Sequence, residues 1–70
     1  MSTDDRAKLQ TLLNYWVEHN REHSDEFREW AEKARQMGEA EIADEILQAV
    51  GNMEKVTELL SATLKKLEEA

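Results

Sequence analysis

Apolar residues recur with the period of an α-helix along almost the whole chain. From Leu9 to Met37, and again from Ile42 to Leu67, they follow alternating steps of four and three residues. This spacing places one stripe in the a and d positions of a heptad repeat. The first stripe comprises Leu9, Leu13, Trp16, Asn20, His23, Phe27, Trp30, Ala34 and Met37. The second comprises Ile42, Ile46, Ala49, Met53, Val56, Leu60, Thr63 and Leu67, flanked by Ala43, Val50 and Leu64.

The residues at the ends of both stripes are typical of helix termini. Ser2 can cap a first helix over about residues 3–37, with Asp5 placed three residues later as in a capping box. Gly38 can adopt the left-handed conformation that ends a helix. A second helix is expected over about residues 39–69, with Lys65 and Lys66 in its last turn. The chain is therefore predicted to be one helical domain, residues 1–70, with a turn at Gly38.

The two helices have matched lengths, about 51 and 46 Å at roughly 1.5 Å per residue. We therefore predict an all-α antiparallel hairpin whose core holds Trp16, Phe27 and Trp30. A two-helix hairpin leaves much of its apolar surface in water, so two copies are expected to form a four-helix bundle. The alternative is a monomeric three-helix bundle in which Ser24 and Asp25 separate two shorter helices.

Composition narrows the possible functions. The 70 residues include no proline and no cysteine. Because cysteine is absent, a disulfide or a thiolate metal site is excluded. The N-terminal sequence MSTDDRAK has no apolar run typical of a signal peptide, and no stretch approaches the roughly 18 apolar residues of a membrane span. We therefore expect a soluble, cytoplasmic protein.

The charge is strongly acidic, with nine Lys and Arg against sixteen Asp and Glu. Residues 39–70 carry most of the excess, with three basic and eight acidic side chains. Nucleic acids and anionic membranes are bound mainly through basic patches, so neither is expected as a partner. A cation or a basic protein partner suits this surface better.

Two histidines carry the main chemical signal. His19 and His23 are four residues apart, so both imidazoles point the same way from a helix and could bind one ion. Glu22 and Glu26 lie along the same edge and could complete the site or orient the imidazoles. Nitrogen and oxygen ligands of this kind suit Ni or Zn. The alternative is structural: Asn20 and His23 form a polar layer that fixes register and oligomeric state.

The segment His19–His23, HNREH, also fits the H-x-x-E-H pattern of inverted zinc peptidases, with Glu22 as the nominal base. That chemistry needs a third ligand from a later helix and a substrate cleft, which 70 helical residues do not provide. We therefore expect a protein without enzymatic activity. It is predicted to self-associate and to bind a divalent transition metal through His19 and His23, or else to be a protein–protein interaction module without a ligand.

The segment WVEHNREHSDEFREWAEKA resembles a part of short, acidic prokaryotic helical proteins that carry a Trp-x-x-His-Asn-x-x-His pattern and have no settled activity. The resemblance covers about residues 9–37 and matches Trp16, His19, Asn20 and His23. A further histidine often precedes the tryptophan in these proteins, and Tyr15 stands there in this chain. The resemblance implies a helical fold, and the tyrosine removes one potential metal ligand.

Overall fold

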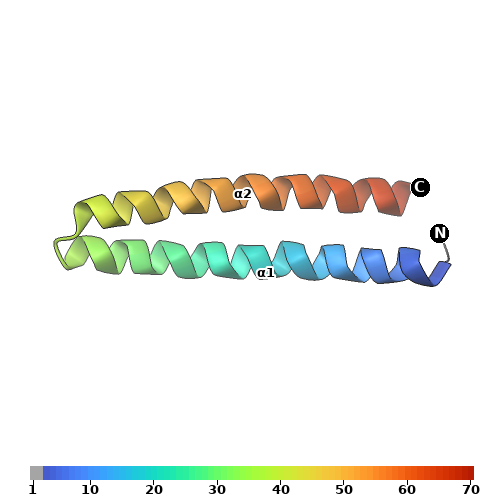
Figure 1. Ribbon diagram of the computed structural model, residues 1–70, viewed down its shortest axis with the longest axis horizontal. Helices are drawn as coiled ribbons and strands as arrows, with labels where there is room; N and C mark the ends of the chain where they lie inside the picture. The colour runs from blue at the N-terminus through green and yellow to red at the C-terminus, as the bar shows by residue number, and fades with distance from the viewer. Residues whose placement is uncertain (1–2) are drawn as a thin grey trace.

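The computed structural model describes residues 3–70, which form two antiparallel helices joined by a tight turn (Figure 1). Helix α1 spans Thr3–Gln36 and helix α2 spans Ala40–Glu69. The hairpin is 53 Å long and 15 Å by 14 Å across. The predicted all-α antiparallel hairpin is thus confirmed. Each helix is continuous, α1 through Ser24 and Asp25, so the three-helix alternative is not what the chain forms. The predicted cap Ser2 lies outside the described residues.

Gly38 ends α1 as the sequence predicts. Its φ is +84°, in the left-handed region that a residue with a Cβ enters only with strain. The amide of Glu39 donates to the carbonyl of Ala34 at 2.9 Å, and the amide of Gly38 donates to the carbonyl of Arg35 at 3.0 Å. These two bonds form a Schellman motif, which satisfies carbonyls left free at the helix end and reverses the chain.

The stripe along which the two helices meet is not the predicted one. In α1 the contact follows Leu13, Val17, Asn20, Ser24, Phe27, Ala31 and Ala34, and in α2 it follows Ala43, Ile46, Val50, Met53, Thr57, Leu60, Leu64 and Leu67. Each of these stripes has heptad spacing and shares every second residue with the predicted stripe of its helix. At the other positions the contact lies one residue further along the chain, so it does not include Trp16, Trp30 and Ile42. The predicted placement of these residues in the hairpin core was wrong.

Small side chains explain this choice of contact stripe. Ala43 is 0% exposed, and Ala31, Ala34 and Ser24 are also buried. Small residues let two helix backbones approach closely, and close approach increases the number of favourable van der Waals contacts. Trp16 and Trp30 are too large for that contact line, and they are 40% and 54% exposed at its border. Hydrophobicity alone favours the large side chains in the contact, whereas the space between the helices favours the small ones.

Polar contacts tie the hairpin together along one side and at its open end. Arg28 pairs with Glu54 and Arg35 with Asp44, each at 2.7 Å. At the open end the guanidinium of Arg6 donates to the carbonyl of Leu67 at 2.9 Å, across 61 residues of sequence. The ion pairs are about half exposed, so each adds at most about 1 kcal/mol. They mark one long border of the hairpin as charged.

The two glycines provide a matched test of the turn. Gly38→Ala places a Cβ at φ +84° and should destabilise the protein by about 1–2 kcal/mol, although no atom lies within 4 Å of that Cβ. Gly51 lies inside α2 with equally free space, so Gly51→Ala should stabilise by up to about 1 kcal/mol. Urea unfolding measures both changes. Equal effects of the same sign would contradict the assigned roles.

Candidate functional site

The border opposite the charged one is apolar, and we name it the apolar edge. It consists of half-buried or exposed side chains that follow heptad spacing on both helices. Its residues are Leu9, Leu12, Trp16, His23 and Trp30 of α1, Met37 of the turn, and Ile42, Ala49 and Val56 of α2. At 100° per residue these positions lie beside the contact stripe on one side of each helix. Most of the large exposed apolar side chains of the hairpin are therefore gathered along one edge.

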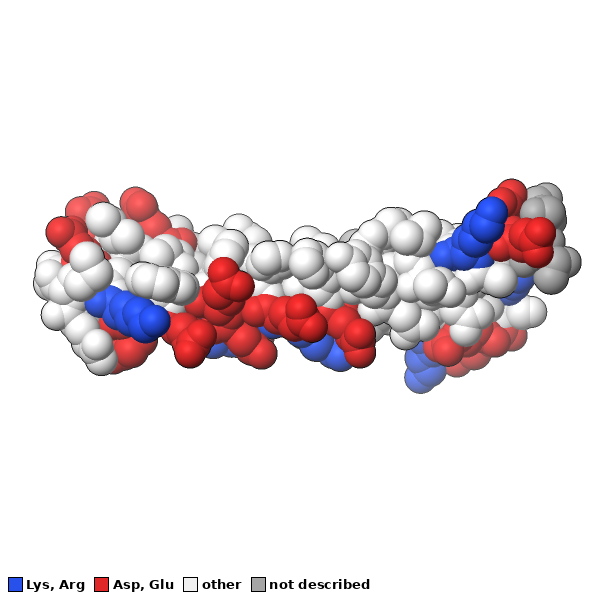
Figure 2. All heavy atoms as spheres, turned by 90° about the horizontal axis from the view of Figure 1, so that it is seen from below, with Lys and Arg blue, Asp and Glu red and all other residues white. Residues whose placement is uncertain are grey.

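Two hollows confirm that the borders differ. Phe27, Trp30, Ile46 and Ala49, with Glu26, line a hollow of about 280 Å³ on the apolar edge. On the other border, Arg28 and Glu54 help to line a hollow of about 260 Å³. Figure 2, which looks onto α1, shows charged side chains along the lower border of the middle of the molecule and a continuous run of uncharged ones above them. The hairpin is thus amphipathic across its width.

A ladder of four aromatic rings runs along α1 beside the apolar edge. Tyr15 stacks on His19 with ring centroids 5.2 Å apart and planes inclined by 14°. His19 meets His23 edge to face at 4.3 Å, and His23 lies 6.2 Å from Phe27. The i, i+4 spacing of these residues produces the ladder, because such side chains lie one above the other on a helix. The neighbouring rings limit the rotation of both imidazoles.

The two histidines lie together as predicted, with their Nε2 atoms 3.0 Å apart. One Nε2–H can donate to the other nitrogen at this distance. Two imidazoles bound to one ion at the usual Zn–N distance of about 2.0–2.1 Å have nitrogens roughly 2.8–3.4 Å apart, for angles from 90° to tetrahedral. The observed separation therefore suits either a hydrogen bond or a shared metal ion.

The predicted acidic ligands do not complete this pair within one chain. Glu22 and Glu26 are exposed on α1. Over residues 3–70, no group of three or more His, Asp or Glu side chains is arranged to hold a metal ion. A hairpin taken by itself offers an ion two nitrogen ligands.

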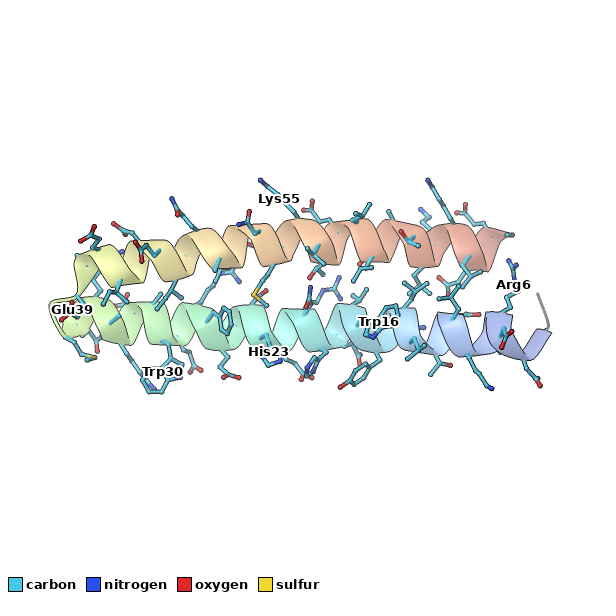
Figure 3. All side chains as sticks on the ribbon, viewed as in Figure 1. Arg6, Trp16, His23, Trp30, Glu39 and Lys55 are labelled. Carbon is cyan, nitrogen blue, oxygen red and sulfur yellow. The ribbon has the colours of Figure 1, made fainter. Side chains whose placement is uncertain are left out.

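The tryptophans frame the histidine pair. Trp16 and Trp30 lie one heptad to either side of His23, and in Figure 3 Trp30 points away from α2. The ammonium of Lys33 lies 4.3 Å from the Trp30 ring centroid, a cation–π contact that is worth about 0.5–1 kcal/mol at an exposed site. Tyr15, at one end of the aromatic ladder, is 55% exposed. Both tryptophans lie on the predicted stripe of α1, but the structure leaves them accessible.

Comparison with known protein families gives a match. Residues 9–67 match the family described as Domain of unknown function (DUF8180). The chain belongs to this family. Searches of curated proteins and of solved structures give no match. The DUF8180 match spans both helices and includes the apolar edge from Leu9 onward.

Neither α1 nor α2 contains a segment that is both apolar and long enough to cross a bilayer.

The charged border contains a test of its own. The Thr57 side chain is buried, and its hydroxyl has no hydrogen-bond partner among the described residues. Thr57→Val keeps the shape and removes the unpaired hydroxyl, so it should stabilise the protein by about 1 kcal/mol. Thr63→Val is the control, because the exposed Thr63 hydroxyl donates to the carbonyl of Leu59. Thermal unfolding measures the stability of both variants. If Thr57→Val is the more destabilising change, the Thr57 hydroxyl has a hydrogen-bond partner.

Proposed function

We propose that this protein functions without catalysis as a self-associating hairpin, in which two copies pair through their apolar edges to form a four-helix bundle. The observation that carries the proposal is the line of exposed tryptophan, methionine and aliphatic side chains on one edge. Contiguous apolar surfaces of this kind commonly mark interaction sites. Because the charged side chains lie along the opposite border, they do not cover this edge, and a second copy can contact it.

The core of one hairpin is small. Its best buried apolar side chains are Leu13, Val17, Val50 and three alanines, whereas both tryptophans remain accessible. Chains of this size rarely obtain enough stability from one such core. Dimerisation along the apolar edge supplies a larger core because it covers Trp16, Trp30 and Ile42 of both copies.

The dimensions of the hairpin also suit a dimer. A long face of 53 Å by 15 Å projects roughly 800 Å², which is the area that each partner buries in a standard protein interface. The same edge on each copy forms an isologous contact, as the commonest dimers require. A docking module for a different protein is the competing function, favoured by the acidic charge of residues 39–70.

A second proposed activity is binding of a divalent transition metal, Ni or Zn, through His19 and His23. The supporting observation is the 3.0 Å separation of the two Nε2 atoms. Each imidazole would carry its proton on Nδ1 and present Nε2 to the ion. Glu22 and Glu26 can reach the neighbourhood only after side-chain rearrangement, so their predicted role as ligands remains secondary.

Self-association is tested by a pair of substitutions on opposite borders. Trp30→Glu places a charge on the apolar edge and should convert the dimer to a monomer at micromolar concentration. Leu47→Glu is the control, since Leu47 is 42% exposed and lies one heptad before Glu54 on the charged border. Sedimentation equilibrium measures both masses.

The wild-type protein should sediment at twice the monomer mass and lose thermal stability on dilution. Its tryptophan emission should shift to longer wavelength on dilution, because Trp16 and Trp30 become exposed. A wild-type monomer whose melting temperature is independent of concentration would reject self-association and favour a module for another protein.

A further inference from the structure

The apolar edge has a nearly symmetric order of side chains about His23. Trp16 and Trp30 lie seven residues before and after His23, and Leu9 and Met37 lie fourteen residues before and after it. A two-fold axis that passes between His19 and His23 therefore brings each Trp16 near the partner's Trp30, and each Leu9 near the partner's Met37. Such self-complementarity is the requirement of an isologous interface.

The second helix has its apolar midpoint at the same level. Ile42, Ala49 and Val56 continue in heptad steps to Thr63, so the centre of this series lies near Asn52. In an antiparallel hairpin, each step back along α1 matches a step forward along α2. Phe27 and Ala49 line one hollow, so His23, four residues before Phe27, lies at the level near Asn52. Both helices thus place the centre of the apolar edge at the histidine pair.

We propose that the dimer completes a metal site that one chain leaves half built, with His19 and His23 of both copies binding one Zn²⁺ or Ni²⁺ ion on the two-fold axis. This inference rests on the proposed self-association. In α1 the pair already has a chelating separation of 3.0 Å, and no third His, Asp or Glu among residues 3–70 joins it. The axis supplies the two missing nitrogens by symmetry.

The resulting set of four neutral imidazoles fits the tetrahedral, nitrogen-rich coordination that Zn²⁺ accepts. The hydrogen bond between Nε2 atoms would be replaced by two metal–nitrogen bonds, and the bridging proton would move to Nδ1 of its own ring. No proton is lost in that tautomer change. Tyr15 and Phe27, at the two ends of the aromatic ladder, would limit ring rotation and so favour the chelating orientation.

The test is calorimetric titration of the metal-free full chain with zinc chloride or nickel chloride, combined with sedimentation. Wild type should bind one ion per two chains. His19→Gln removes one imidazole of each pair and should lose saturable binding. Trp30→Glu keeps both histidines but separates the copies. Its affinity should fall by at least about 100-fold, since loss of even an outer-shell partner costs about 10–100-fold. Trp16→Glu repeats this test if Trp30→Glu does not fold.

The possible outcomes distinguish this inference from self-association itself. A wild-type dimer without saturable metal uptake overturns the shared site and leaves self-association intact. Monomeric Trp30→Glu that binds one ion per chain with wild-type affinity also overturns it, because the pair then needs no partner. A chain that stays monomeric with and without metal rejects both proposals. A chain that dimerises only with metal, at one ion per two chains, supports the shared site and makes assembly metal-dependent.

Cobalt gives a structural readout that a merely stabilising role of the histidines would not produce. Co²⁺ substituted into a four-imidazole tetrahedral site should show intense visible absorption, whereas Co²⁺ held by two imidazoles and water should show the weak absorption of an octahedral ion. Wild type should therefore show the intense tetrahedral spectrum, and Trp30→Glu should show the weak octahedral one. An octahedral spectrum in the wild-type dimer would overturn the proposed coordination.

Discussion

Close approach of two helices along one narrow stripe is the constraint on which this structure depends. Two backbones come near each other only where the side chains between them are small, and this chain places Ser24, Ala31, Ala34 and Ala43 there. The tight turn at Gly38 brings the helices together at one end, and the Arg6–Leu67 hydrogen bond joins them at the other. With these small residues holding the backbones close, Trp16 and Trp30 lie beside the contact. The exposed apolar edge is therefore a direct consequence of how the hairpin closes.

The sequence predicted the elements well because their signals are local. Helical periodicity, the charges near the helix ends and the left-handed preference of glycine act within a few residues, and Gly38 adopts the predicted conformation. The contact stripe is different, because two heptad stripes in α1 share Leu13, Asn20, Phe27 and Ala34. The remaining members are either large, such as Trp16, or small, such as Ala31. Hydrophobicity favours the large set, while the space between two helices favours the small set, and only the packed structure distinguishes them.

The histidine pair was predictable to the same extent. Spacing alone places His19 and His23 on one side of α1, and the structure brings their Nε2 atoms to 3.0 Å. The contribution of Tyr15 and Phe27 to the aromatic ladder also follows from i, i+4 spacing. Glu22 and Glu26 share that side of the helix, but a shared side is a weaker condition than convergence of donor atoms on one point. Convergence depends on rotamers, which spacing does not determine.

In the proposed dimer, a histidine at the centre of an apolar edge also limits how two copies can align. Moving the partner by one heptad would set His23 against Trp16 or Trp30 of the other chain. An imidazole nitrogen buried there without a partner would be unfavourable. The symmetric alignment instead sets the histidine pairs of the two copies beside each other, where each nitrogen can find a hydrogen-bond partner or a shared ion. The structural role of the polar layer and the metal-binding role are therefore two consequences of one arrangement. A metal ion would strengthen a register that the histidines already favour.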